Sequence, residues 1–176
     1  MDSLGIKTIK TFPASFVFDI LISMKTPDRQ GSKKEDKADL EVVSISFLKE
    51  KIRKLHEKPS AAIGLLLSGD RISCCDEGVV MQEGENVIGV ATIAPEGEEQ
   101  SGQPTIVALY VSKEYRGKGY GSQILRKAIE RCIERGFDKI RMDVMSSNAK
   151  KIIDKLPQDF QGKIEVHDLG NIMDSF

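Results

Sequence analysis

The stretch that decides the fold is Leu109-Tyr110-Val111-Ser112-Lys113-Glu114-Tyr115-Arg116-Gly117-Lys118-Gly119-Tyr120-Gly121-Ser122. An almost continuously apolar run, Thr105–Val111, ends inside it and predicts a central strand. A glycine-rich turn at 115–121 then leads into a helix expected over 122–135. The first turn of a helix has N–H groups without partners and partial positive charge, and glycines let a ligand approach the backbone closely. With Arg116 and Lys118 beside them, these groups predict an anion site suited to a phosphate or pyrophosphate.

The spacing of the glycines excludes three common phosphate-binding motifs. A P-loop requires GxxxxGK followed by Ser or Thr, and a dinucleotide fingerprint requires GxGxxG; neither string occurs in this stretch. The glycine-rich loop of kinases fails on the same count. What the chain has is Arg-x-x-Gly-x-Gly, at Arg116, Gly119 and Gly121. Leu-x-Val, at Leu109 and Val111, precedes it on the expected strand, and an amphipathic helix follows it.

Hydrophobic periodicity and turn residues predict the elements on either side. Strands are expected over 40–45, 79–82, 87–94, Thr105–Val111, 139–145 and 163–167, with hairpin chemistry at 83–86. Helices are expected over 47–58, 61–67 and 122–135, and from a cap at Ser146 or Ser147 through Leu156. Residues 16–23 favour a further strand, with a short helix as the alternative, and 26–37 and 95–104 are typical of polar loops. The core is therefore antiparallel strands followed by a strand-helix-strand unit.

Two of these helices show an apolar side. The first is marked by Leu48, Ile52 and Leu55. The apolar stripe of the long helix consists of Ile124, Leu125, Ala128, Ile129, Cys132 and Ile133. Gly136 follows this stripe at the place where a left-handed glycine ends a helix.

The motif and its surroundings resemble motif A of the GCN5-related N-acetyltransferase (GNAT) superfamily. The order of elements from about Leu40 to His167 also matches: strand, helices, three antiparallel strands, helix, strand, helix, strand. Asn148 falls at the start of the helix after the fifth strand, where the family often carries an asparagine. The resemblance implies an α/β (α+β) fold, with a central mixed, mostly antiparallel sheet splayed at the motif-A strand and flanked by helices.

The resemblance also implies that the chain binds acetyl-CoA and releases CoA. Backbone groups of Leu109 and Val111 would pair with the pantetheine arm as with an added strand. Asn148 would touch the pantetheine or ribose end, and Lys113 and Lys118 would either contact a nucleotide phosphate or remain solvated. The pyrophosphate would be held by Arg116, Gly117, Lys118, Gly119, Tyr120, Gly121 and Ser122.

The family's reaction is direct attack of a neutral amine on a thioester, which makes this chain an expected N-acetyltransferase. The backbone N–H of Val111 would donate to the developing oxyanion. Tyr110 is the second catalytic candidate, with packing or lining the cleft as its alternative role. Many members have a glutamate where this chain has Thr105, and a tyrosine on the helix after Asn148, where 149–156 contains none. The sequence therefore offers no clear residue for the general base or the general acid, and deprotonation of the amine by the substrate itself or through a water relay stays open.

Other side chains with suitable chemistry favour structural roles. His56 is expected on an exposed helix surface, His167 is expected to be a satisfied structural histidine, and Cys132 is expected in the core. Cys74 and Cys75 follow a turn with no base nearby in the sequence. The acidic residues Glu96, Glu98 and Glu99 are expected to be solvated, although they hint at a cationic acceptor such as a lysine, polyamine or aminoglycoside.

Composition sets the limits for partners. The chain has 176 residues, and 26 Lys and Arg against 27 Asp and Glu give a formal net charge of −1, which disfavours nucleic acid. No apolar stretch nears the roughly 18 residues of a membrane span, and no signal peptide is expected. Three cysteines form neither a disulfide framework nor a metal-ligand spacing, so a cytoplasmic protein without a metal is expected. Residues 1–39 are interpreted as an N-terminal extension with a polar loop, and 40–176 as the acyl-CoA-binding domain.

Two alternatives to the enzyme stay open. The chain could be a CoA-binding module without catalysis, with a sensor or assembly role, as the missing glutamate and tyrosine suggest. It could also be a nucleotide-binding regulatory domain, which would leave the Leu-x-Val context unexplained.

The family usually closes its sheet with a hairpin, and 168–176 is too short for a seventh strand. Residues 16–23 or a second copy in a homodimer would then cover that edge.

Overall fold

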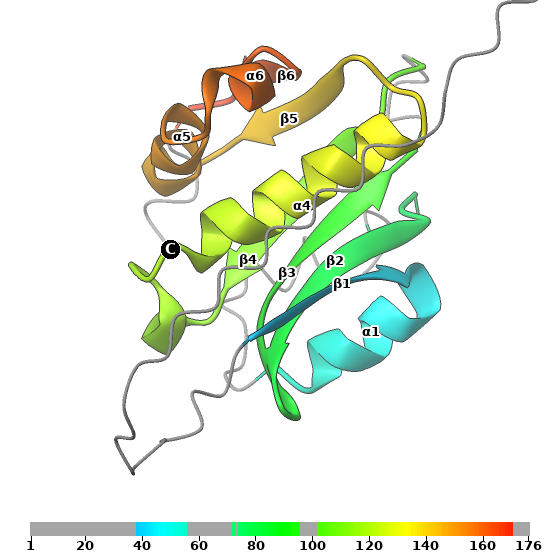
Figure 1. The fold of residues 1–176 in the computed structure, drawn as a ribbon, viewed down its shortest axis with the longest axis vertical. Helices are drawn as coiled ribbons and strands as arrows, with labels where there is room; N and C mark the ends of the chain where they lie inside the picture. Colours follow the sequence, from blue (N-terminus) through cyan, green and yellow to red (C-terminus); the bar gives the residue numbers. More distant parts are fainter. Residues whose placement is uncertain (1–37, 56–71, 73, 96–101, 171–176) are drawn as a thin grey trace, which may run out of the picture. The chain divides into compact units, whose positions relative to one another are not determined.

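Six strands form one sheet in the order β1-β2-β3-β4-β5-β6 (Figure 1). The computed structural model describes residues 38–55, 72, 74–95 and 102–170, all within the compact unit Asp36–Phe176. The strands are β1 (Asp39–Ser44), β2 (Glu77–Glu83), β3 (Asn86–Ala94), β4 (Thr105–Val111), β5 (Ile140–Val144) and β6 (Ile164–Asp168). Pairs from β1 to β4 are antiparallel, whereas β4–β5 and β5–β6 are parallel. The mixed, mostly antiparallel sheet expected from the sequence is confirmed.

The β2–β3 hairpin lies where the turn residues predicted it. Its turn is narrower than the expected 83–86, because Glu83 and Asn86 already pair and only Gly84 and Glu85 connect them. Gly84 has φ +59, a left-handed conformation that glycine adopts without a Cβ penalty. Both strands are therefore longer than the runs 79–82 and 87–94.

The sheet is splayed between β4 and β5. The two strands pair only at Thr105 with Arg141 and at Ile106 with Met142. β4 then continues to Val111 beside β3, whereas β5 continues beside β6 as far as Val144. The second half of β4 therefore has no β5 partner, as the resemblance implied.

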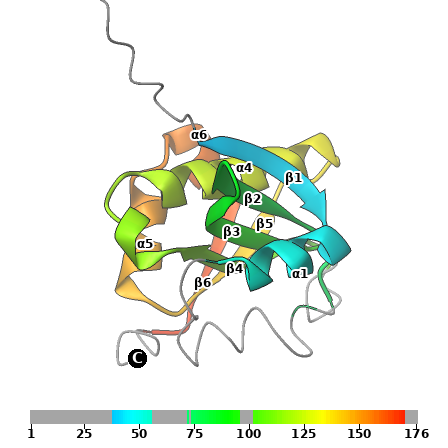
Figure 2. The same cartoon turned by 90° about the horizontal axis from the view of Figure 1, so that it is seen from below.

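Helices cover the two faces of the sheet (Figures 1 and 2). α4 (Tyr120–Glu134) and α5 (Ser147–Asp154) pack on one face, over a core cluster that includes Met81, Ile106 and Met142. α1 (Ile45–Arg53) packs on the other face at β1 to β3, over a second cluster that includes Val80 and Tyr110. Ile106 and Tyr110 of β4 lie on different faces although they are four residues apart, because the β3–β4 register shifts between Thr92 and Ile93.

Two helix bounds and one core assignment from the sequence need correction. α1 ends at Arg53 and not at 58, because Leu55 leaves the helix and forms a parallel bridge with Val87. α4 begins at Tyr120 and not at 122, because Gly119 serves as its N-cap with φ 84. Ile133 is 40% exposed, since it lies about 100° around the helix from Cys132, at the rim of the stripe. The other five stripe residues are fully buried, and Gly136 has the expected positive φ of 91.

The C-terminal part follows the sequence pattern with one addition. Ser146 caps α5, since its Oγ accepts a hydrogen bond of 3.1 Å from the backbone N–H of Ala149. α5 ends at Asp154, before the expected Leu156, and a short helix that the sequence did not predict follows it, α6 (Gln158–Gln161). The expectations for 16–23, 26–37 and 61–67, and most of the one for 95–104, lie outside the described residues.

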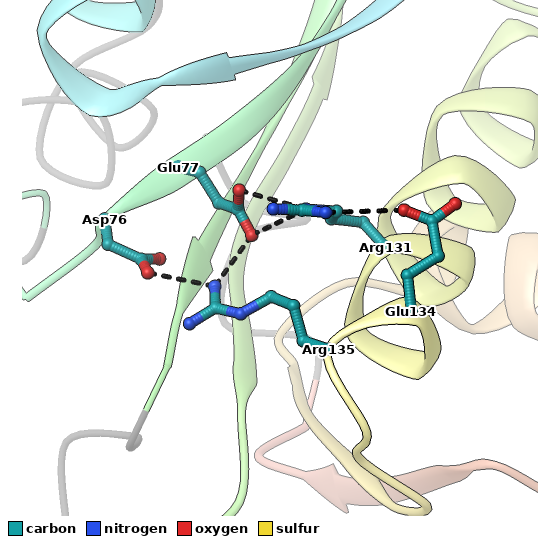
Figure 3. Close-up of polar contacts among 5 residues, drawn as sticks. All are labelled: Asp76, Glu77, Arg131, Glu134 and Arg135. Atoms are coloured by element: carbon teal, nitrogen blue, oxygen red, sulfur yellow. Dashed lines mark hydrogen bonds and ion pairs between the residues drawn. The ribbon is translucent and has the colours of Figure 1, made fainter.

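An ion-pair cluster links α4 to the start of β2 (Figure 3). Glu77 binds Arg131 Nε through both carboxylate oxygens at 3.1 Å and Arg135 Nη1 at 2.7 Å. Asp76 and Glu134 extend the cluster, at 2.9 Å from Arg135 and 3.4 Å from Arg131. The carboxylates raise the pKa of Arg131, chiefly through its hydrogen bond to Glu77. These contacts fix the C-terminal half of the helix whose other end forms the candidate site.

Candidate active site

The free edge of β4 presents backbone groups to the split in the sheet. Ser112 N–H donates to Ile88 O at 2.8 Å, so position 112 faces β3. Because backbone groups of a strand alternate between its two sides, Leu109 and Val111 direct their N–H groups away from β3, toward the split. Both are half-buried. These are the two residues that the motif predicted would pair with an extended ligand.

Arg116 closes the end of this strand. Its Nε donates a hydrogen bond of 2.9 Å to Val111 O, and its guanidinium lies 5.7 Å from the ring centroid of Tyr110. The sequence suggested a cation for a phosphate, whereas the structure uses Arg116 to hold the carbonyl of Val111. That leaves the N–H of Val111 and both backbone groups of Leu109 facing the split.

The three motif glycines serve different purposes. Gly117 and Gly119 have φ values of 79 and 84, and a Cβ at either position would meet nothing within 4 Å. They give the turn its conformation and an open surface, which a side chain would fill. Gly121 is buried, and a Cβ there would lie 3.0 Å from Ile152 Cδ1 and 3.6 Å from Val111 Cγ2. Its role is close packing of α4 on α5 and β4, which differs from the ligand approach expected from the sequence.

The start of α4 has the expected character of an anion site. Its first i→i−4 bond runs from Gln123 N to Gly119 O at 3.2 Å, so the N–H groups of Tyr120, Gly121 and Ser122 lie ahead of the helical ladder. Lys118 Nζ lies 5.1 Å from the ring centroid of Tyr115. The loop therefore combines helix N–H groups with a cation beside open glycines.

The remaining predicted ligands lie near this loop. Asn148 is exposed in the first turn of α5, the helix that contacts Gly121 through Ile152. Lys113 is exposed in η1 (Lys113–Tyr115), the single turn between β4 and the glycines. The fold thus brings Asn148 toward the motif from about 30 residues further along the chain.

The expected catalytic positions on β4 lie inside the sheet. Tyr110 is only 4% exposed, in the cluster under α1 with Val90 and Ala108, which favours its packing role. Thr105 is 5% exposed, and its Oγ1 has no hydrogen-bond partner. A buried threonine hydroxyl is not a base, so Thr105 does not supply the basicity of the glutamate that many family members have at this position.

Two of the three cysteines, Cys75 and Cys132, are buried. Burial raises the pKa of Cys132 to about 11 and that of Cys75 to about 12. Both thiols therefore stay protonated at neutral pH, and the core role expected for Cys132 is confirmed by its complete burial. Cys74 is half-buried. His56 and the acidic residues Glu96, Glu98 and Glu99 lie outside the described residues.

Sequence reasoning missed one polar group, which surrounds His167. Asp143 Oδ1 lies 3.3 Å from His167 Nδ1 and 3.0 Å from Arg141 Nε. Arg141 and Asp143 alternate with the buried residues of β5, so the sequence held a signal of a polar strand face. It held no sign that His167, 24 residues after Asp143, pairs with it in register. Within the described part of the chain, no group of three or more His, Cys, Asp or Glu side chains could hold a metal ion.

Comparison with known proteins identifies the family of this fold. A family model for the acetyltransferase (GNAT) family matches residues 49–152. The chain belongs to the GNAT family. That segment contains the second half of α1, the strands β2 to β5, the glycine loop, α4 and the first part of α5, and it includes every residue predicted to bind acetyl-CoA.

The chain is also similar to individual proteins. A thialysine N-epsilon-acetyltransferase from Sus scrofa is 39% identical over 44 residues, which is 25% of this chain and 26% of that protein. The match therefore spans about a quarter of the curated relative. A GNAT family N-acetyltransferase from Escherichia coli, solved in complex with CoA, has a TM-score of 0.51 at 16% identity and covers 79% of this chain and 93% of its own. An IAA acetyltransferase from Bacillus cereus has a TM-score of 0.49 at 20% identity, over 68% and 75%.

The chain thus belongs to a family whose model is named for acetyltransferases. The structural likeness adds the fold, with its mixed six-stranded sheet between helices. None of the helices in the described part of the chain is long and apolar enough to cross a membrane.

Proposed function

We propose that the protein transfers the acetyl group of acetyl-CoA to a primary amine by direct attack. The observation that carries this is the continuity of β4 with the loop: an edge without a β5 partner beyond Ile106 leads to the open glycines and the start of α4. The pantetheine arm of CoA needs an unpaired strand edge along which it can extend, and the pyrophosphate needs the glycine loop with the N–H groups at the start of α4. Bound acetyl-CoA would supply the acyl group as a thioester.

The residues that would hold acetyl-CoA fit this assignment. Leu109 and Val111 offer backbone groups at the split, and the N–H groups of 117–122 with the Ser122 hydroxyl surround the helix start. Asn148, on α5, would contact the arm or ribose, and Lys113 and Lys118 would attract the nucleotide phosphates. Arg116 would contribute its backbone to the loop and its side chain to the carbonyl of Val111.

Val111 would also serve the chemistry. Its N–H faces the split, where it would donate to the oxygen on which negative charge develops. Because Arg116 fixes the adjacent carbonyl at 2.9 Å, this N–H is held before a ligand arrives. The amine must lose a proton first, since an unperturbed lysine side chain has a pKa of roughly 10.4.

The experiment is a thermal shift with acetyl-CoA, CoA, ATP and NADH, on the wild type and on Arg116→Glu. At about a hundred times its dissociation constant a ligand stabilises the fold by roughly 2.7 kcal/mol. We expect acetyl-CoA and CoA to raise the melting temperature, and Arg116→Glu to lose the effect. The matched control is Arg53→Glu, the same charge change on the exposed end of α1. No response to either CoA ligand would refute the proposal.

Turnover separates the enzyme from the alternative, a CoA-binding module without catalysis. Thr105 favours that alternative, because its buried hydroxyl occupies the place of the family's glutamate. The assay is release of the CoA thiol from acetyl-CoA with lysine, thialysine, spermidine and kanamycin as acceptors. Thialysine is included because of the relative's name. Amine-dependent release supports the enzyme, whereas binding without release with any of these acceptors supports the module.

A further inference from the structure

Arg141, Asp143 and His167 form a hydrogen-bonded group that the reaction above does not use. Arg141 Nε donates to Asp143 Oδ1 at 3.0 Å, and His167 Nδ1 lies 3.3 Å from the same oxygen. Arg141 Nη2 is 3.1 Å from His167 Nδ1. The side chains of Arg141 and Asp143 are 19% and 17% exposed, whereas that of His167 is 56% exposed. The histidine is therefore accessible, and its two partners are held in place.

The group lies beside the split in the sheet. Asp143 follows Met142, the last β5 residue that pairs with β4, and it pairs with His167 in the β5–β6 register. Ile140, Met142 and Ile164 point into the core under α4, so the three polar side chains lie on the opposite face. On β4 this face carries Thr105, which pairs with Arg141 and has a buried, unpartnered Oγ1.

This face is the one left for the acceptor, an argument that rests on the proposed function. The glycine loop, the start of α4 and Asn148 would hold acetyl-CoA at the α4 and α5 side of the split. A second substrate must then reach the thioester from the other side, where α1, among the helices that the structure describes, packs mainly on β1 to β3. An ammonium arriving there meets the carboxylate of Asp143 and the imidazole of His167.

We propose that His167 is the general base that deprotonates the acceptor amine, with Asp143 and Arg141 as its positioning residues. When His167 Nδ1–H donates to Asp143, the lone pair of Nε2 is free to accept a proton. Arg141 Nε orients the carboxylate of Asp143 beside Nδ1, and Asp143 then orients the imidazole as in other Asp–His pairs. The Arg141 Nη2 contact is a hydrogen bond in the other tautomer, in which Nε2 carries the proton.

The proton balance closes without a further reactant. The ammonium gives one proton to His167 Nε2, which passes it to water. The neutral amine forms the C–N bond as the C–S bond breaks, and the electron pair of that bond stays on sulfur. The second proton leaves the nitrogen as the amide forms and ends on the thiolate, which gives CoA.

The test compares three variants in the thiol-release assay with the acceptor panel, between pH 5.5 and 9.5. His167→Gln removes the base, and Asp143→Asn removes its orienting carboxylate. Glu165→Gln is the matched control, because Glu165 lies on the same face of β6 and is exposed. Glu165, Arg141 and Asp143 are the charged groups of β5 and β6 on this face, so the control also measures the general effect of charge on the pH profile.

We expect His167→Gln to lower kcat by about 100-fold, the scale of general-base catalysis, and to abolish the acidic limb of the pH profile. Asp143→Asn should lower kcat by about 10-fold, and Glu165→Gln should change neither quantity. The thermal shift with acetyl-CoA should persist in all three variants, which shows that they fold and bind. An unchanged kcat and pH profile in His167→Gln, beside an active wild type, would overturn the inference and leave the proposed function intact. A wild type that binds acetyl-CoA but releases no thiol with any amine would overturn both.

Discussion

Replacing Glu77 with glutamine should destabilise the protein by about 2 kcal/mol. Glu77 is 13% exposed and is the shared partner of Arg131 and Arg135, which are 34% and 23% exposed (Figure 3). An exposed ion pair contributes about 0.2–1 kcal/mol, whereas breaking a buried one costs roughly 3–5 kcal/mol. The carboxylate is nearly buried but both guanidiniums still reach water, which places the loss between these limits. For a protein of this size, about 2 kcal/mol corresponds to a melting temperature lower by roughly 6 °C.

The assay is urea unfolding followed by circular dichroism, with Glu130→Gln as the control. Glu130 forms the same kind of pair with Arg126 at 3.0 Å, but on the exposed surface of α4, so its loss should stay below about 0.5 kcal/mol. A double-mutant cycle with Arg131→Gln should give a coupling energy of about 1 kcal/mol. Equal losses for Glu77→Gln and Glu130→Gln would refute the reasoning, because they would mean that burial adds nothing to the cluster.

Two further predictions concern packing and pH. Gly89→Ala should lower the free energy of unfolding by more than about 2 kcal/mol in urea, because its Cβ would lie 2.6 Å from Tyr110 O and 2.8 Å from Ile124 Cδ1. In the control Gly117→Ala, the Cβ meets only open space at φ 79, so the loss should be about 1 kcal/mol. Equal losses in the two variants would contradict this reasoning. Burial raises the pKa of Cys132 from 9.0 to about 11. Between these pH values the thiol of the unfolded chain ionises, whereas the thiol of the native protein stays protonated. The stabilising contribution of Cys132 is therefore fully present below pH 9 and is lost as the pH rises to about 11. Unfolding at pH 8 and 10 should show about 1 kcal/mol of this loss, and a Cys132→Ala variant with the same pH slope would disprove it.

The part of the fold that local signals encode was predictable from the sequence. Glycines, caps and apolar runs lie within a few residues of the structure that they determine, so β4, the loop and the end of α4 at Gly136 follow from them. Contacts between distant residues leave no such pattern. Glu77 meets Arg131 across 54 positions, and the bridge of Leu55 with Val87 ends a helix that its own periodicity would have continued.

The candidate site shows the same division within single residues. The sequence contained the cation Arg116 but not its partner, because the approach of Arg116 to Val111 O depends on the turn between them. The three glycines were visible in the sequence, but their different roles were not predictable from it. The contact of Gly121 with Ile152, for example, requires α5 to return to the start of α4. Residue type thus indicated which groups are present, and three-dimensional packing decided which contacts each of them makes.

The split between β4 and β5 explains why the two substrates would use different faces. Beyond Ile106 and Met142 the strands follow different neighbours, β3 and β6. The split therefore opens to the α4 side, with the glycine loop and Asn148, and to the opposite side, with Asp143 and His167. Side chains of a strand alternate between faces, so Arg141, Asp143 and His167 lie on the face opposite α4, whereas Asp168 lies on the α4 and α5 side, where it pairs with Lys150 of α5. A general base for this reaction is thus expected on the face that lacks the glycine loop, where His167 lies.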